Sequence, residues 1–463
     1  MPNRHGLCRI TRVLLPLMLA AALLAGCSAV PGVPGSPGGQ TGTSSGGTAH
    51  SEQSQGAPPG SSGASGAGGR GSSGSNSAGS AGDAAHDSSG TASSGGAGRE
   101  ELRGVWISYL ELKGIFSSQQ TFEAGIDKMF DDAKSLNLNA VFVHVRAFSD
   151  AFYPSKYFPW SAYITGTQGK DPGYDPLDYM VKAAHARGLE FHAWINPYRV
   201  SATSTDPKKL SETNPARVWM TDADASNDDW AVKAAGGIYY NPASVEVQAL
   251  VINGIREIVD HYDVDGVHFD DYFYPVTSAS FDQAAYARYQ KQAGGGAMSL
   301  GDWRRTNVSA LISGVYHAIK ARSKDIVFGV SPFASIEKNY DTYYADVCAW
   351  SQGGYLDYLM PQLYFGFEYP KAEFRFDALA EAWRDSIDTQ KTALYFGLAS
   401  YKLGTEQEAD APEWNNSGDL LRRQVEYIRD TRHADGFVFY SYTSLFSGDE
   451  LCTREREQLR GVL

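Results

Sequence analysis

Short apolar runs alternate with amphipathic stretches from residue 99 to residue 463. The runs are rich in β-branched and aromatic residues and only a few residues long, which is typical of strands buried in a parallel sheet. Eight strands are predicted, at 103–108, 140–146, 190–196, 264–271, 326–331, 356–364, 393–400 and 436–442.

Helices are predicted between these strands, at 121–136, 176–187, 244–262, 302–322, 341–350, 375–388 and 417–431, with a last one at 448–459. Eight β-α units predict an α/β protein of the (β/α)8 TIM-barrel class with long βα loops. An open doubly wound sheet is the alternative, but it would not need eight parallel strands. It would also be expected to carry a Gly-rich phosphate loop, which the sequence lacks.

The strand within Val264–Pro275 stands out because it ends in two adjacent carboxylates, Asp270 and Asp271, followed at once by Tyr272. At a period of two, His268 and Asp270 share one face. In a barrel the carboxyl ends of the strands form the mouth, where catalytic residues lie. A plain helix N-cap is the structural alternative for an isolated Asp.

Polar and aromatic side chains also stand at or near the ends of most other predicted strands. Aromatic faces stack on sugar rings, and amide, imidazole and guanidinium groups bond to sugar hydroxyls, so this set predicts a carbohydrate cleft. The candidate substrate-binding residues are Arg146, His192, Asn196, His268, Tyr272, Gln362, Tyr364, Tyr401, Trp414 and Tyr442.

Glycosyl transfer needs two carboxyl groups that flank the scissile bond, one of them protonated. Asp270 is the first candidate, because it shares the inner face with His268. Glu368, just past the strand at 356–364, is the best-placed partner. Asp271 and Glu337 are alternatives, and Asp271 could instead support Arg146 or a loop.

The first 26 residues have the features of a bacterial lipoprotein signal. Three arginines precede an apolar stretch too short to span a bilayer, and Leu24-Ala25-Gly26-Cys27 matches a lipobox. We expect cleavage before Cys27, acylation of this Cys with fatty acids such as palmitate, and anchoring on the extracytoplasmic face of the cell membrane. Residues 27–98 are mostly Gly, Ser, Ala, Pro and Thr, and they predict a disordered tether ahead of the domain at 99–463.

The charge of the chain argues against nucleic acid as a partner. Its formal net charge is −13 and would become about −16 without the signal arginines. The sequence contains no CxxC or HExxH spacing, P-loop or GxGxxG after a strand, so we expect no metal or cofactor. Cys348 and Cys452 would remain in the domain and could pair, although sequence alone does not establish it.

Seven segments resemble the bacterial glycosyl hydrolase-like family 10, a group of extracytoplasmic lipoproteins. They are RGVWIS (103–108), the run at 153–181, FHAWINPYRV (191–200), DGVHFDDYFYP (265–275), GVSPF (329–333), DYLMPQLYF (357–365) and DGFVFYSYTSL (435–445).

The resemblance covers nearly all of 101–447. It implies a (β/α)8 barrel, a glycosidase-type site, and action on cell-wall polysaccharide, in particular peptidoglycan glycan strands that lack stem peptides. On the matching positions the family's motifs place polar residues at Asp270, Asp271, Arg146, His192, Asn196, Gln362 and Tyr364. The chain departs from many relatives after SPF, where Ala334 replaces Gly.

These observations predict a membrane-anchored glycoside hydrolase that acts on cell-wall glycan by a two-carboxylate mechanism. Two alternatives stay open. One is a non-catalytic glycan-binding lipoprotein that keeps the cleft without the chemistry. The other is a hydrolase of a different extracellular polysaccharide, which only a panel of substrates would distinguish.

Overall fold

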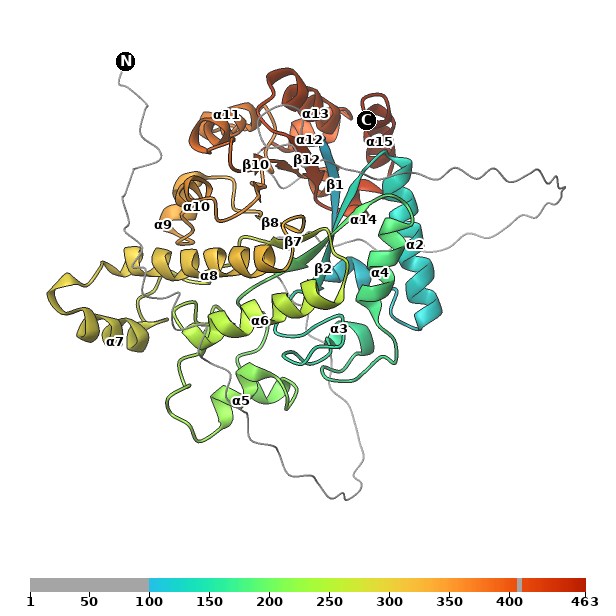
Figure 1. Ribbon diagram of the computed structural model, residues 1–463. Coiled ribbons are helices and arrows are strands. Elements are labelled where there is room, and N and C mark those ends of the chain that lie inside the picture. The colour runs from blue at the N-terminus through green and yellow to red at the C-terminus, as the bar shows by residue number, and fades with distance from the viewer. Residues whose placement is uncertain (1–99, 406–409) are drawn as a thin grey trace, which may run out of the picture. The chain divides into compact units, whose positions relative to one another are not determined.

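The computed structural model describes residues 100–405 and 410–463 (Figure 1). The expected signal peptide, the lipidation site at Cys27 and the whole tether at 27–98 lie outside these residues. None of the helices described is long and apolar enough to cross a membrane.

A parallel sheet closes into a barrel. Its hydrogen-bonded order is β10-β9-β8-β7-β3-β2-β1-β12-β11. Residues 393–398 form one strand that is interrupted at Tyr395, so that its first half pairs with β9 and its second half with β12. The ring therefore has the eight strand positions that the sequence predicts, which confirms the (β/α)8 fold and excludes the open sheet. The strands are β1 (Leu102–Ile107), β2 (Ala140–Arg146), β3 (Glu190–Ile195), β7 (Gly266–Phe269), β8 (Val327–Val330), β9 (Tyr358–Leu359), β10 (Ala393–Leu394), β11 (Phe396–Leu398) and β12 (Gly436–Phe439).

Helices surround the barrel, as Figure 1 shows. Those that correspond to the predicted helices are α2 (Gln119–Ser135), α4 (Pro176–His185), α6 (Val245–His261), α8 (Leu300–Arg322), α10 (Val347–Gly353), α11 (Phe376–Ser386), α13 (Leu420–Thr431) and α15 (Glu450–Arg460). Their first residues follow from capping chemistry: Ser118, Ser244 and Ser299 each accept a hydrogen bond from a backbone N–H in the first turn.

The long βα loops carry structure that the apolar pattern does not predict. A three-stranded antiparallel sheet follows β3 and is formed by β4 (Arg199–Ser201), β5 (Ala231–Ala234) and β6 (Gly237–Tyr240). Further helices in the βα loops and near the barrel rim are α1 (Tyr109–Leu112), α3 (Ala162–Thr165), α5 (Pro215–Thr221), α7 (Gln283–Ala293), α9 (Ile336–Asp341), α12 (Ala411–Asn416) and α14 (Tyr442–Leu445).

Aromatic and imidazole rings fill the barrel interior. Trp106, Phe142, Trp194 and Tyr358 belong to one buried cluster inside the ring of strands. Glycines on the inner faces of the strands make room for these rings, because a Cβ at Gly329 would overlap the ring of Tyr358. Cys452 is a free, buried thiol, so it does not pair with Cys348.

Candidate active site

Asp270 lies directly after β7 and is almost fully buried. Three donors face its carboxylate: Asn196 Nδ2 to Oδ1 at 3.0 Å, Trp194 Nε1 to Oδ2 at 3.2 Å, and the backbone N–H of Tyr272 to Oδ1 at 3.4 Å. Burial raises the pKa of Asp270, while the positive charge of Arg199 and the donated hydrogen bonds lower it. The net shift is upward, although the donors favour the ionised form.

His144 lies beside the same carboxylate but forms no hydrogen bond to it in the described part of the chain. The backbone N–H of Tyr109 donates to His144 Nδ1, which puts the proton of the neutral ring on Nε2, 4.0 Å from Asp270 Oδ2. Burial holds the pKa of His144 well below its usual value, with the charge of Arg199 acting in the same direction. His144 also stacks on Trp194 with 3.3 Å between ring centres.

Asp271 has a different environment. Burial, followed by the neighbouring charge of Asp270, raises the pKa of Asp271 to about 7, and a hydrogen bond from Gln362 partly opposes this rise. Unlike Asp270, it is partly exposed. The charge of Asp271 also contributes to raising the pKa values of Tyr343 and Tyr364.

Arg199 was not among the residues that the sequence singled out. Its guanidinium carbon lies 4.9 Å from the ring centre of Tyr272 and 4.6 Å from that of Phe148, and its Nε donates to the Ala147 carbonyl. It lowers the pKa values of both Asp270 and Asp271. The one feature of the sequence that could have indicated a role for Arg199 is its place in the NPYR segment, three residues after Asn196.

A buried ion pair fixes the loop that follows the two acids. Arg304 of α8 donates to both carboxylate oxygens of Asp282, at 2.8 and 2.6 Å, and both side chains are fully buried. The same guanidinium donates to the carbonyls of Thr277 and Ser278. Helix α8 therefore holds the C-terminal end of the loop that runs from Asp270 to Asp282.

His268 and His192 lie inside the barrel, below the mouth. Trp106 Nε1 donates to His268 Nε2 at 3.1 Å, and His268 Nδ1 lies 3.1 Å from the hydroxyl of Tyr358. This hydroxyl is 3.4 Å from His192 Nδ1, and His192 Nε2 is paired with Glu190. All ring nitrogens of the two histidines thus have partners inside the barrel, and both side chains are buried. Neither histidine is accessible to a sugar, which corrects their assignment as substrate-binding residues.

Arg146 does not face the mouth, because the register of β2 against β3 shifts between His144 and Arg146. This irregularity turns Arg146 to the outer side of the barrel. There its guanidinium lies 4.3 Å from the ring centre of Phe158 and close to Gly254 of α6. Arg146, which was expected to contact substrate, is therefore buried away from the mouth in this structure.

Two aromatic assignments also need correction. Trp414 has no exposed surface and donates through Nε1 to Asp410 at 2.9 Å. Tyr442 points away from the mouth, and its hydroxyl donates to Asp132 of α2 at 2.6 Å. The residue that takes the inner position at the end of β12 is Tyr440, whose ring contacts Trp106 and stacks with Tyr364 at 5.7 Å between ring centres.

The remaining predicted residues divide into two groups. Gln362, Tyr364, Tyr401 and Tyr272 lie around the mouth: Tyr364 contacts Tyr401 and Tyr440, and Tyr272 is about half exposed. Glu368 and Glu337 are exposed. The backbone of Glu368 is fixed by Glu413, and no contact joins its side chain to Asp270 or Asp271 among the described residues. The carboxyl group that the structure brings next to Asp270 is that of Asp271.

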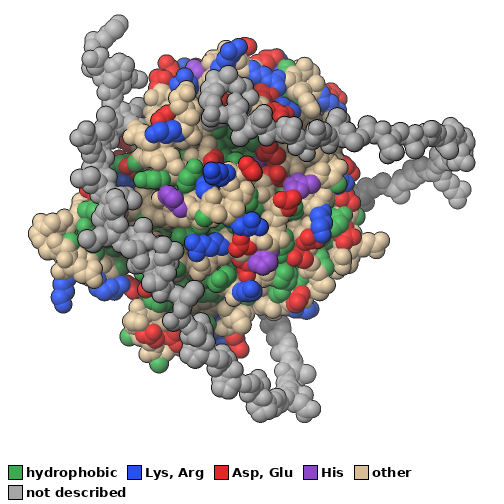
Figure 2. Space-filling view, viewed as in Figure 1, with side chains coloured by type: hydrophobic (Ala, Val, Ile, Leu, Met, Phe, Trp, Pro, Cys, Tyr) green, Lys and Arg blue, Asp and Glu red, His purple; other side chains and the backbone are tan. Residues whose placement is uncertain are grey.

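The described part of the chain contains no group of three or more His, Cys, Asp and Glu residues arranged to hold a metal ion. On the face shown in Figure 2, positively and negatively charged side chains are interspersed.

The comparisons with known proteins agree with this architecture. A family model described as glycosyl hydrolase-like 10 matches residues 101–416. The chain is 39% identical over 362 residues to the glycosyl hydrolase YngK of Bacillus subtilis, which covers 72% of this chain and 68% of the relative. It is 36% identical over 396 residues to the glycosyl hydrolase DigH of Escherichia coli K12, with coverage of 78% and 85%.

Solved structures with little sequence identity share the fold. The glycoside hydrolase domain of PgaB (BpsB) from Bordetella bronchiseptica aligns with a TM-score of 0.53 at 15% identity, over 78% of this chain and 99% of that domain. The catalytic domain of β-amylase from Paenibacillus polymyxa aligns with a TM-score of 0.50 at 10% identity, over 78% and 98%. With its closed barrel and acids at the mouth, the chain belongs to the glycosyl hydrolase-like 10 family and is a glycoside hydrolase-type protein.

Proposed function

We propose that this protein is an active glycoside hydrolase in which Asp270 and Asp271 are the catalytic carboxyl groups. One observation carries the proposal: two consecutive acids at the carboxyl end of the same barrel strand have different hydrogen-bonding environments, although burial raises the pKa of both. Asp270 accepts hydrogen bonds from several donors, while the pKa of Asp271 is raised to about 7. Pairs of carboxyl groups whose environments differ in this way divide acid and base roles.

The two environments support a division of roles. Asp271 remains protonated up to near-neutral pH and is the proton donor to the departing sugar oxygen. Asn196, Trp194 and the backbone of Tyr272 donate hydrogen bonds that favour the carboxylate form of Asp270 against the effect of burial, which suits a nucleophile or a base. Arg199 provides positive charge near both carboxyl groups. The rings of Tyr272, Tyr364, Tyr401 and Tyr440 form the walls on which sugar rings stack.

The substrate we propose is a polysaccharide of the cell wall, most specifically peptidoglycan glycan strands without stem peptides. Its support is the sequence: the lipobox at Cys27 and the Gly/Ser-rich stretch that follows suit a domain tethered outside the cell membrane, next to the wall. The family resemblance supports the same substrate.

A panel of glycans tests the activity and the substrate together. The full chain is incubated with wall sacculi, with sacculi stripped of peptides by an amidase, and with other extracellular polysaccharides, and new reducing ends are counted. We expect more new reducing ends from the amidase-stripped sacculi than from any other glycan in the panel. Release from another polysaccharide alone would reassign the substrate. Binding without release from any of them would favour the non-catalytic glycan-binding alternative.

A further inference from the structure

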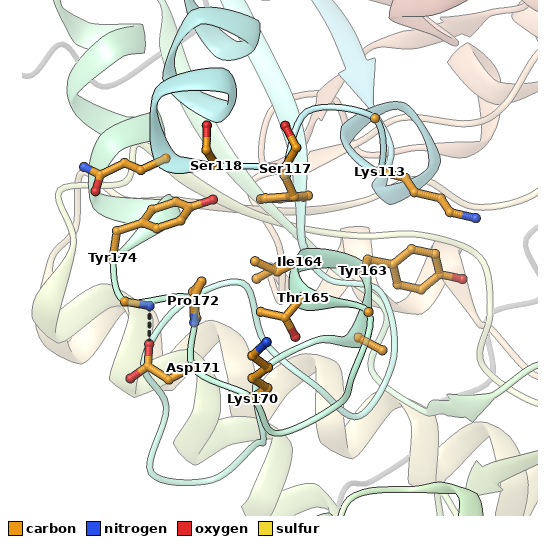
Figure 3. Close-up of a pocket in the computed structure, with 16 residues that line it drawn as sticks. Lys113, Ser117, Ser118, Tyr163, Ile164, Thr165, Lys170, Asp171, Pro172 and Tyr174 are labelled. Atoms are coloured by element: carbon orange, nitrogen blue, oxygen red, sulfur yellow. Dashed lines mark hydrogen bonds between the residues drawn. The ribbon is translucent and has the colours of Figure 1, made fainter. Parts of the chain in front are cut away.

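A second hollow lies beside the mouth, between the loops that follow β1 and β2 (Figure 3). Its volume is about 820 Å³, enough for a sugar ring with a substituent. It is lined by segments at 113–119, 162–166 and 170–174. None of the candidate residues named from the sequence lies in it.

Ring contacts join this hollow to the acids. Tyr163, one of its lining residues, contacts Tyr109 with 4.7 Å between ring centres and stacks on Phe148 at 5.9 Å. Tyr109 in turn contacts His144, whose Nε2 faces Asp270. Phe148 packs against Arg199. A continuous set of side-chain contacts therefore connects the lining of the hollow to the surroundings of Asp270.

The charge of the hollow differs from that of the chain as a whole, whose net charge is −13. Lys113 and Lys170 both line it, both are exposed, and neither forms an ion pair among the described residues. Figure 3 shows the ammonium end of Lys170 turned toward the interior of the hollow and Lys113 at the end near Tyr163. The one acid in the lining, Asp171, accepts a hydrogen bond from the backbone of Gly173 at 2.7 Å.

Aromatic and hydroxyl groups complete the lining. Tyr163 and Tyr174 lie on opposite sides, as Figure 3 shows, and Ser117 and Thr165 lie between them. The hydroxyl of Tyr174 is buried and has no hydrogen-bond partner among the described residues. Rings that stack on a sugar, hydroxyl groups, and two unpaired ammonium groups together suit a sugar that carries an anionic substituent.

We infer that this hollow is a distal subsite for a carboxylated sugar of the glycan strand, bound through Lys113 and Lys170. The inference rests on the proposed function and specifies its substrate class further: a strand whose sugars carry free carboxylates. A lactyl ether on an amino sugar and a uronic acid both present this group, so the test includes both sources.

The test compares the full chain with its Lys113→Met/Lys170→Met variant, which keeps the aliphatic stems and removes both charges. The matched control is Lys291→Met/Lys324→Met, which removes two exposed lysines remote from the hollow, one on α7 and one just before β8. Substrates are peptide-free wall glycan strands, and the same strands after conversion of their carboxyl groups to amides. A short lactyl-bearing strand and an oligouronate serve as competitors.

We expect the pocket variant to raise KM for the unmodified strands by roughly threefold to tenfold, as the loss of exposed ion pairs would. Its kcat should change little, and the control should match the wild type. Amidation should raise the wild-type KM to the same degree and have no added effect on the pocket variant. The stronger competitor, lactyl-bearing strand or oligouronate, identifies the carboxylate source.

An unchanged KM in the pocket variant, or an equal loss on amidated strands, would overturn the inference. Its failure is separable from failure of the proposed function. If the wild type cleaves nothing, calorimetric titration of the same strands still compares the pocket variant with the control. A loss of affinity confined to the pocket variant and to unmodified strands then supports the subsite, and equal affinities rule it out.

Discussion

Asn196 Nδ2 donates a hydrogen bond to Asp270 Oδ1 at 3.0 Å, while Asn196 Oδ1 accepts from the backbone N–H groups of Tyr198 and Arg199. A single buried amide thus ties the candidate catalytic carboxylate to the segment that carries Arg199. In the proposed mechanism Asn196 is therefore a positioning residue, which acts through Asp270 and Arg199.

Asn196→Ala should lower both stability and catalysis. Two backbone donors lose their acceptor, which costs about 1–3 kcal/mol of unfolding free energy. Loss of a donor to the carboxylate raises the pKa of Asp270 further, so the acidic limb of kcat/KM should move to higher pH. The control is Asn214→Ala, since Asn214 is also fully buried and bonds to Ser149 and Ala216 away from the acids. If Asn196→Ala and Asn214→Ala lose similar stability and neither shifts the acidic limb of kcat/KM, the role of Asn196 is structural only.

If Asp271 is the general acid, it sets the basic limb of the pH–rate profile. Because its pKa is raised to about 7, it is protonated below that pH and loses the proton as pH rises through it. As general acid it is active only when protonated, so wild-type kcat/KM should decline above about pH 7. Asp271→Asn should lower the rate by about 10²- to 10⁴-fold and remove this limb. If the variant keeps both the rate and the limb, another group is the acid.

Arg199 links the two acids electrostatically. Its positive charge lowers the pKa values of both Asp270 and Asp271, so Arg199→Met should raise both values. The whole pH–rate profile should then move to higher pH, and Arg199→Lys should restore most of the original position because it keeps the charge. If the pH–rate profiles of the two variants coincide, the effect of Arg199 comes from its stacking on Tyr272 and Phe148 and not from its charge.

Glu455 should make stability depend on pH. It is fully buried, accepts hydrogen bonds from the backbones of Leu420 and Leu421, and has its pKa raised by burial from 4.5 to about 7. A carboxyl group with a raised folded-state pKa stabilises most when protonated. The free energy of unfolding should therefore fall by about 2–3 kcal/mol as pH rises from about 4.5 through 7.

Urea unfolding of Glu455→Gln across this range measures the effect, and Glu457→Gln, an exposed acid on the same helix, is the control. The Glu455→Gln variant should show a flatter dependence than the wild type, while the control should reproduce the wild-type curve. Equal slopes in all three proteins would show that Glu455 does not titrate in this window.

The fold was predictable because eight buried strands need eight apolar runs, and period-two alternation puts Asp270 on the face of His268. The rim was harder. The irregularity after His144 that turns Arg146 outward leaves no mark in the sequence. The chain turns into α14 after β12, so Tyr440 takes the inner position rather than Tyr442. Arg199 contacts the mouth from a loop sheet that the apolar pattern does not reveal.

The separation of roles between neighbouring acids also needed the structure. In sequence Asp270 and Asp271 differ only in strand face, and Glu368 seemed a better partner because it ends another strand. The packing in the structure favours Asp271 as the partner: side chains from the end of β3 donate to Asp270, while Gln362 and tyrosines lie near Asp271.

Removal of the Asp270 carboxylate tests the catalytic proposal most directly. Reducing ends released from amidase-stripped wall glycan are measured for the wild type and Asp270→Asn, alongside thermal unfolding and strand binding of both. We expect the variant to fold and bind the strands as the wild type does, while its rate falls by at least about 10³-fold, as for loss of a catalytic nucleophile or base. A folded Asp270→Asn variant that cleaves at the wild-type rate would contradict a catalytic role for Asp270.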